Sequence, residues 1–276
     1  MLLRLPNELL QCIAKDLEFA EHINAFARTN TRLYNLINPY LYRYDVQQLG
    51  SSALLWAAEQ GQDATAQKSL DQGANPLSLS EFDETLLALA ARNGHEAVVK
   101  LLLATEGVNP DSQGSDGRTP LSWAAEDGHE TVVKLLIATE GVNPDSQDSW
   151  GWTPLSWAAM NGNEEVVKLL LATEGANLDS EDSDGRTPLS LAAEKGYEAV
   201  VKLLLATEGV NPDFKDSAGR TPLLWAAMNG NEEVVKLLLA TERVNPDSQD
   251  SNGLTPLWCR TNYENGNGTI GNFYAR

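Results

Sequence analysis

The stretch TPLSWAAEDGHETVVKLLIATEGVNPDSQDSWGW, residues 119–152, decides the fold, because its pattern returns along most of the chain. Thr-Pro pairs recur every 34 residues, and residues 153–174 and 221–242 differ at one position only. A fixed period of this length is typical of a repeat protein, in which each unit is one supersecondary motif. The sequence therefore predicts a stack of six complete units, which start at residues 52, 85, 119, 153, 187 and 221.

Each unit reads as two short helices followed by a loop. Thr119 can cap the first helix, Pro120 suits its first position, and Gly128 ends it. The loop VNPDSQDSWG is rich in turn-forming residues. The second helix carries a wide apolar face made of Val132, Val133, Leu135, Leu136 and Ile137. Because helices this short are marginal alone in water, stability has to come from packing between neighbouring units.

These residues resemble a known family. TPLSWAA, GHETVVKLLI and the Gly-Val-Asn turn are similar to the ankyrin repeat, over about residues 52–260. The resemblance implies an all-α solenoid of paired antiparallel helices with finger loops. One departure is Ser122, with serine again at the same place in two later units, where the family often has histidine. A hydroxyl is a shorter hydrogen-bonding group than an imidazole, so we expect a different local network there.

The units differ from one another mainly in the finger loop and at the end of the first helix. In ankyrin proteins the matching positions line a concave groove that binds the target, so the resemblance implies a protein-binding surface here. The candidate groove residues are Asp116, Arg118, Glu126, Asp127, Trp150, Trp152, Met160, Asn161, Asp184, Arg186, Glu194, Lys195, Arg220, Met228 and Asn229.

Two tryptophans stand at a loop tip, where water disfavours their apolar area. With Met160, Trp150 and Trp152 would form an apolar anchor inside an acidic groove, since tryptophan is enriched in binding hot spots. The alternative is that one or both fold back against the next finger. Trp123, Trp157 and Trp225 recur at one helix position, so we interpret them as packing residues.

The first 46 residues do not match the repeat. The opening LPNELLQCIAKDL resembles an F-box, a small helical module that docks on the Skp-family linker subunit of SCF ubiquitin ligases. The resemblance implies that Leu5, Pro6, Leu9, Leu10 and Ile13 contact that linker. The alternative is that these helices only cap the open end of the stack. The predicted organisation is a module over 1–46, a linker over 47–51, repeats over 52–254 and an incomplete seventh unit with a polar tail over 255–276.

The net charge of -19 lies entirely after residue 50, where 34 acidic and 15 basic side chains stand. Such a surface repels phosphate backbones, which argues against nucleic-acid binding, and it favours a basic protein target. The alternative is that acidic loops merely keep a long surface soluble. No stretch approaches the roughly 20 apolar residues of a membrane helix, and we find no secretory signal. We therefore expect an intracellular protein that works as a monomer and needs no cofactor.

No local motif indicates catalysis. The chain has no phosphate-binding loop or dinucleotide fingerprint, and His22, His95 and His129 form no ligand cluster. The run from Asp182 to Gly185 is not a calcium loop, because Leu191 stands where the bidentate glutamate should be. We predict a non-enzymatic protein without metal or cofactor. An adaptor of an SCF ligase, a scaffold or inhibitor that only binds, and an enzyme with an unrecognised pocket remain as alternatives.

The C-terminal end begins a seventh unit with TPLWCR and then abandons the pattern. Either the tail folds over the last helices as a makeshift cap or the chain is a truncated version of a longer array. We predict a frayed tail after Asn262, as chain termini commonly fray.

Overall fold

The computed structural model describes residues 42, 43, 45, 46 and 51–259. It divides the chain into two compact units, Met1–Asn109 and Pro110–Arg276, and each is described by itself. The helices expected before residue 42 and the fraying expected after Asn262 fall outside the described residues.

From Ser51 onward, the described residues of the first unit form two helical pairs. They are α4 (Ser52–Gln60), α5 (Asp63–Asp71), α6 (Leu86–Arg92) and α7 (Glu96–Leu103). Helix α4 packs against α5 and α6, and α5 packs against α7. The loop between the pairs closes with a single antiparallel bridge from Leu79 to Thr85. His95 lies between the pairs, where its Nε2 atom contacts the carbonyl oxygen of Glu59 at 2.8 Å, which agrees with a structural role for this histidine.

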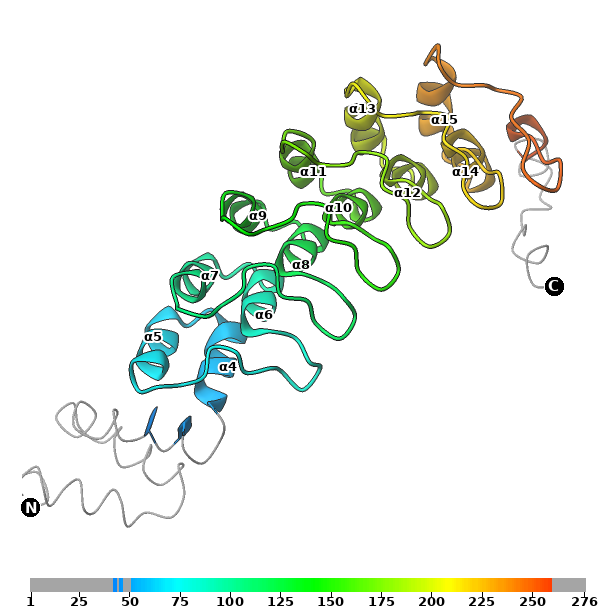
Figure 1. The fold of residues 1–276 in the computed structure, drawn as a ribbon. Coiled ribbons are helices and arrows are strands. Elements are labelled where there is room, and N and C mark those ends of the chain that lie inside the picture. Colours follow the sequence, from blue (N-terminus) through cyan, green and yellow to red (C-terminus); the bar gives the residue numbers. More distant parts are fainter. Residues whose placement is uncertain (1–41, 44, 47–50, 260–276) are drawn as a thin grey trace, which may run out of the picture. The chain divides into compact units, whose positions relative to one another are not determined.

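The second unit contains four helical pairs. They are α8 (Pro120–Glu126) with α9 (Glu130–Ile137), α10 (Pro154–Asn161) with α11 (Glu164–Leu171), α12 (Pro188–Lys195) with α13 (Glu198–Ala206), and α14 (Pro222–Met228) with α15 (Glu232–Leu239). Within this unit the first helices of the pairs form one row and the second helices another, and the finger loops project beside the first row (Figure 1). A short helical stretch over 256–259 begins a further repeat.

The first helix of each pair begins at its Thr-Pro pair as the sequence predicts. At α8, Thr119 Oγ1 accepts a hydrogen bond from Ser122 N at 3.2 Å, and Pro120 fills the first helical position. The serine that replaces the family's histidine lies 3.1 Å from Thr119, hydroxyl to hydroxyl, and is buried. The expected difference in the local network is therefore a compact pair of hydroxyl groups at the starts of α8, α10 and α12.

The second helix is amphipathic and buries one side against its neighbours. In α9, Val132, Val133 and Leu136 are fully buried, whereas Lys134 on the opposite side pairs with Glu130. Each such buried side chain contributes about 1.5–3 kcal/mol relative to its exposed state. Helix α9 packs against α11, α11 against α13 and α13 against α15, so the apolar sides form one continuous core through the unit.

Candidate functional site

An aspartate organises four of the finger loops of the second unit. In the first complete example, Asp148 Oδ1 accepts hydrogen bonds from the backbone N–H groups of Trp150 and Trp152, both at 2.9 Å. The same pattern recurs at Asp182, Asp216 and Asp250, where the backbone N–H groups of the second and fourth residues after the aspartate donate to its Oδ1 atom. This carboxylate bends the chain into a fixed turn, as short polar side chains do in Asx turns.

Adjacent fingers are joined through their backbones. Ser183 N donates to Trp150 O at 2.9 Å, and Ser183 Oγ donates to the same oxygen at 2.8 Å. Gly151 has a φ of 78°, and a Cβ there would lie 3.1 Å from the backbone of Asp182, so only glycine fits. Trp150 is therefore held on both sides, by its N–H to Asp148 and by its carbonyl oxygen to Ser183.

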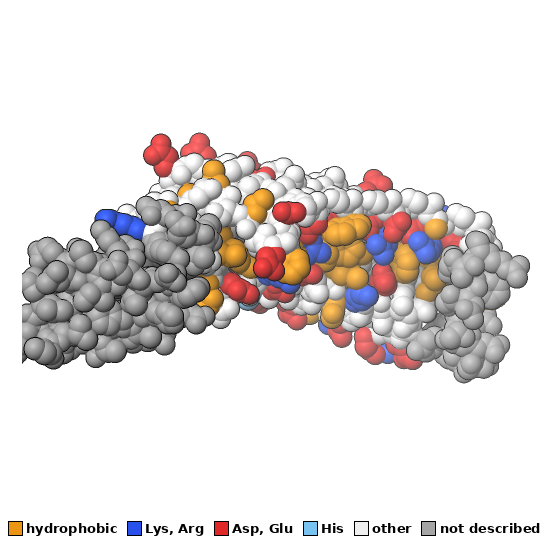
Figure 2. Space-filling view, turned by 90° about the horizontal axis from the view of Figure 1, so that it is seen from below, with side chains coloured by type: hydrophobic (Ala, Val, Ile, Leu, Met, Phe, Trp, Pro, Cys, Tyr) orange, Lys and Arg blue, Asp and Glu red, His pale blue; other side chains and the backbone are white. Residues whose placement is uncertain are grey.

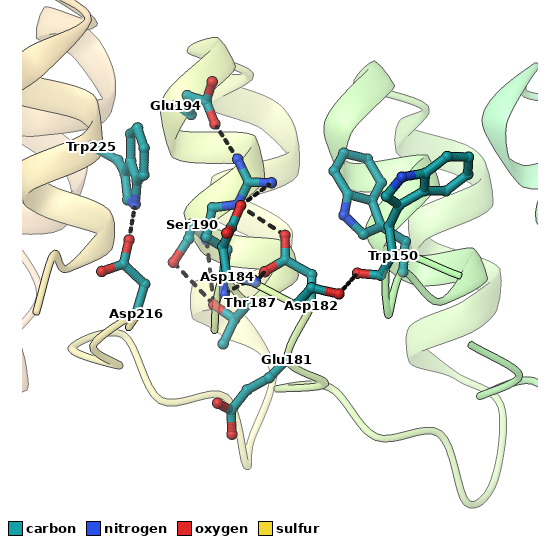
Figure 3. A network of polar contacts seen from close by, with 12 residues as sticks. Trp150, Glu181, Asp182, Asp184, Thr187, Ser190, Glu194, Asp216 and Trp225 are labelled. Atoms are coloured by element: carbon teal, nitrogen blue, oxygen red, sulfur yellow. Dashed lines mark hydrogen bonds and ion pairs between the residues drawn. The ribbon is translucent and has the colours of Figure 1, made fainter. Parts of the chain in front are cut away.

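The second carboxylate oxygen of the finger aspartate binds an arginine in two of the fingers. Asp182 Oδ2 accepts from Arg186 Nε at 2.8 Å, and Arg186 reaches Glu194 on α12 at 3.4 Å (Figure 3). At Asp216, Arg220 Nε donates at 2.8 Å. Trp225 Nε1 donates to the same carboxylate oxygen at 3.1 Å (Figure 3). These contacts tie each finger to the first helix of its own repeat.

The finger that carries Trp150 departs from this arrangement. Trp152 stands where the next two fingers have arginine, so Asp148 Oδ2 instead accepts from Trp157 Nε1 on α10, at 2.9 Å. The rings of Trp152 and Trp157 then stack at 4.5 Å between centroids with a tilt of 49°. Tilted contacts of this kind add about 0.5–1.5 kcal/mol to the burial of the rings.

Arg118, from the preceding repeat, lies against Trp157 and close to Asp148. Its own finger has Gly114 at the aspartate position. The guanidinium instead pairs with Glu126 at 2.5 Å and lies 3.5 Å from Asp116 and 3.9 Å from Asp148. It also stacks over the rings of two tryptophans, 3.5 Å from the centroid of Trp157 and 4.2 Å from that of Trp123.

These side chains enclose a pocket of about 420 Å³. Its lining consists of Arg118, Trp150, Trp152, Trp157, Asp182, Ser183, Asp184 and Arg186. Trp150 is 51% exposed at its rim, so it contacts solvent with half of its surface. Figure 2 shows a face of the molecule on which hydrophobic side chains lie among both basic and acidic ones.

The structure brings about half of the predicted groove residues together. Asp116, Arg118 and Glu126 form one charged cluster, and Asp184, Arg186, Glu194 and Lys195 form another through salt bridges of 3.4–3.7 Å. Trp150 and Trp152 lie between them in the lining of the pocket. Of the three residues of the predicted apolar anchor, Trp150 and Trp152 line the pocket and Met160 does not, and Trp152 is also half-buried against Trp157.

Other predicted groove residues lie apart from the pocket lining. Met228 packs against a small core cluster with Cys259. Asn161 and Asn229 donate to the carbonyl oxygens of Trp157 and Trp225 in their own helices, at 3.0 and 2.9 Å. The remaining three are Asp127, exposed at the end of α8, Met160, half-buried on α10, and Arg220, which is paired with Asp216.

The structure gives the recurring helix tryptophans a further role. We expected Trp123, Trp157 and Trp225 to be packing residues, yet Trp157 forms a wall of the pocket and Trp123 stacks on Arg118. None of the three is fully buried. The signal in the sequence is the aspartate nine residues earlier, which accepts the indole N–H of Trp157 and of Trp225.

The carboxyl groups and the thiol whose pKa values are shifted by burial lie in the return loops and at the end of the unit. Burial raises the pKa of Asp111, Asp179 and Asp213, although hydrogen bonds to each carboxylate oppose the effect. Burial also raises the pKa of the Cys259 thiol to about 11. A protonated thiol at neutral pH is a poor nucleophile.

Within the described part of the chain, no group of three or more His, Cys, Asp or Glu side chains is arranged to hold a metal ion. None of the helices described is both long and apolar enough to span a bilayer.

Comparisons with known proteins agree with this architecture. A family model for ankyrin repeats in three copies matches residues 54–148, 127–216 and 200–266. The ankyrin repeat domain of Bcl-3, described as a unique member of the IkappaB protein family, is 26% identical, with a TM-score of 0.65 over 75% of this chain and 92% of that one. The human ASB11 ankyrin repeat domain is 29% identical, with a TM-score of 0.67 over 75% of this chain and 90% of that one.

No curated protein matches the chain at a significant level. The match of the family model nevertheless spans well over half of the 276 residues, and both solved domains share the arrangement of paired helices and fingers. The chain therefore belongs to the ankyrin-repeat family, whose folds serve protein–protein interaction.

Proposed function

We propose that the fingers and first helices of the second unit bind a protein target, with Trp150 as a central anchor. The strongest support is the geometry of Trp150. Its indole is half exposed, and hydrogen bonds to its N–H and to its carbonyl oxygen fix its backbone. A rigid aromatic side chain loses little conformational entropy when it is buried by a partner. The surrounding candidate groove residues would complete the contact surface.

We further propose that the chain recruits this target to an SCF-type ubiquitin ligase inside the cell. The proposal rests on the resemblance of LPNELLQCIAKDL to an F-box and on its position directly before the repeats. Leu5, Pro6, Leu9, Leu10 and Ile13 would dock on the Skp-family linker, and the groove would hold the substrate. The short segment between the module and Ser52 would keep the two bound proteins close together.

A pull-down with the purified linker subunit tests the adaptor function. We expect the full chain to retain the linker and Leu9→Asp to lose it, because a buried charge in an apolar interface costs several kcal/mol. Leu9→Met is the matched control and should still bind. No retention by the unsubstituted chain, or equal retention by Leu9→Asp, rejects the adaptor function.

A scaffold or inhibitor whose N-terminal helices only cap the stack is the second candidate. It is favoured by contacts of the described residues before the first repeat. The Asp45 carboxylate accepts from Ser52 Oγ at 2.5 Å and from Ala53 N at 3.1 Å, and Arg43 Nε donates to Gln72 Oε1 at 2.6 Å. Asp45 thus serves the first turn of α4 as an N-terminal cap.

Deleting residues 1–46 separates the two candidates. If the module is only a cap, the deletion should abolish folding or solubility, and the linker should never bind the full chain. If the module is a docking element, circular dichroism should still show a folded repeat stack, and only linker binding should be lost.

The target side is tested by proximity labelling with the intact chain. Replacing Trp150 and Trp152 together by alanine should weaken the main labelled partner by more than about 1 kcal/mol, the usual effect of removing an aromatic hot spot. Equal labelling by the double variant would place the target elsewhere on the chain.

A further inference from the structure

The two arginines that line the Trp150 pocket are both already paired with carboxylates. Arg118 is bound by Glu126 at 2.5 Å, with Asp116 3.5 Å away. Arg186 is bound by Asp182 at 2.8 Å and lies 3.4 Å from Glu194 and 3.5 Å from Asp184. Both guanidiniums are largely buried, so water screens these pairs only weakly.

A charged group entering this pocket would disturb the pairs. An ammonium or guanidinium would come close to two guanidiniums, both in the lining of the pocket. A carboxylate would meet Asp182 and Asp184 and would have to compete with them for Arg186. Either group would also lose its hydration on entering the pocket. Incomplete ion pairing inside the pocket does not offset the free energy of that desolvation. The pocket therefore favours an uncharged group.

The walls and the size of the pocket narrow the choice further. Three of its lining residues are tryptophans, and the rings of Trp152 and Trp157 stack on each other at 4.5 Å. A volume of about 420 Å³ lies toward the lower end of the range for ligand sites and accommodates one large side chain. Aromatic and aliphatic groups gain most from such walls, because both ring faces and edges offer apolar contact.

The inside of the pocket favours an uncharged group, whereas its exposed rim favours positively charged groups. The Asp184 side chain, which lines the pocket, is 70% exposed. The repeats as a whole carry the excess of acidic side chains that makes the net charge -19. Over distances up to about 10 Å at ordinary salt, this field attracts positive charge.

We propose that the pocket binds one large uncharged apolar side chain of an extended protein segment whose neighbouring residues are lysine or arginine. The inference rests on the proposed function of the groove and specifies its ligand. The apolar side chain enters between Trp150 and the Trp152–Trp157 pair, and the basic residues on either side of it remain at the acidic rim. Affinity comes from the anchor, and attraction to the rim speeds association.

Selection from a library of random peptides displayed on phage tests the inference with the full chain. We expect enriched peptides to share one Trp, Phe, Leu, Ile or Met residue flanked by Lys or Arg. Synthetic versions of the best peptide, with the anchor changed to Ala, Glu or Lys, should each bind at least about tenfold more weakly in fluorescence polarisation. Changing the flanking basic residues to Ser should reduce both the affinity and its dependence on salt.

Trp150→Ala and Trp258→Ala form a matched pair for the same assay. Trp258 is 45% exposed, close to the value for Trp150, but it is outside the lining of the pocket. We expect Trp150→Ala to weaken the peptide at least about tenfold and Trp258→Ala to change affinity by less than about twofold.

Two results would overturn the inference while leaving the groove as a binding site. One is an enriched peptide whose essential residue is charged, and the other is unchanged affinity in Trp150→Ala. Absence of any peptide that binds in the groove would remove both the inference and the proposed target site.

Discussion

At the scale of single residues, two substitutions between repeats account for the pocket. Where the following fingers place arginine against the finger aspartate, this finger has Trp152, and the aspartate binds an indole instead. The preceding finger has Gly114 in place of the aspartate, so Arg118 pairs with Glu126 and stacks on Trp157. Two departures from the repeat pattern thus bring three aromatic rings and a guanidinium together.

Asp148→Ala should destabilise the second unit by about 2–4 kcal/mol, because it leaves buried donors without an acceptor. The donors are the N–H groups of Trp150 and Trp152 and the indole N–H of Trp157. Urea unfolding followed by circular dichroism measures the loss. Asp184→Ala, at an exposed position two residues after the corresponding aspartate of the next finger, should cost less than about 0.5 kcal/mol and is the control.

The sequence identified Trp150 and Trp152 as candidate anchors because tryptophan at a loop tip is unusual. It did not identify Trp157, which looks like any residue repeated on a helix. Its position in the pocket depends on a hydrogen bond to a finger and on an arginine from the preceding repeat. Contacts between repeats depend on how neighbouring repeats are aligned in the stack. The sequence pattern of a single repeat does not reveal that alignment.

At the scale of helices, the starts were predictable and some ends were not. Thr-Pro marks each first helix of the second unit, because the threonine side chain and the proline ring both act locally. No residue of the pattern marks the end of the second helix: α9 ends at Ile137, four residues before Gly141. Thr139 ends it earlier, since its hydroxyl donates to Leu135 O at 2.8 Å and its N–H to Leu136 O at 2.9 Å.

Successive pairs are also joined by a side chain at the start of the second helix. Asn163 Nδ2 donates to the carbonyl oxygens of Ala125 and Glu126 at 2.9 and 2.7 Å, which satisfies the end of α8. Asn231 makes the same two contacts with the end of α12, at 2.8 Å each. The asparagine just before the second helix of one repeat therefore satisfies the last carbonyl oxygens of the first helix in the preceding repeat.

Asn163→Ala should cost about 1–3 kcal/mol, because two carbonyl oxygens at the end of α8 lose their donor. Asn161→Ala is the control, since Asn161 is exposed and bonds only within its own repeat, to Trp157 O. We expect a loss below about 0.5 kcal/mol for that variant. A thermal unfolding series with equal losses for the two variants would contradict the role given to Asn163.

At the scale of the whole second unit, each repeat depends on the one that follows. The leucine after Thr-Pro is buried in the complete repeats, as Leu189 is with 1% exposure, yet Leu257 at the same position is 67% exposed. Beside it, Val235 and Leu239 line an open apolar pocket of about 290 Å³. The sequence anticipated that the last helices lack their usual neighbour, because the pattern stops after TPLWCR.

Leu189→Ala should therefore destabilise the stack by about 2–5 kcal/mol, the usual result of removing a buried leucine. Leu257→Ala should cost less than about 1 kcal/mol, because its side chain is already largely in water. Hydrogen exchange compares the two variants most directly, since it reports each repeat separately. Similar losses would mean that the last repeat is covered in solution.

Stability should also depend on the buried carboxyl groups of the return loops. Burial raises the pKa of Asp179, so the folded chain holds this proton at a pH where the unfolded chain has lost it. Stability from this group is present below its unfolded pKa and is lost as pH rises through the folded value. Asp179→Asn keeps an oxygen for Asn211 N and should stabilise the chain more at about pH 7 than at about pH 4 in urea titrations. An equal effect at both values would contradict the shift.

The stacked indoles of Trp152 and Trp157 give the chain an optical probe of its own. Electronic transitions of two rings this close couple, so their near-ultraviolet circular dichroism and emission depend on the tilt between them. A guest that wedges against either ring alters that tilt and hence the spectrum. Occupancy can therefore be followed without attaching a dye, and Trp157→Phe should silence the response while leaving Trp150 in position.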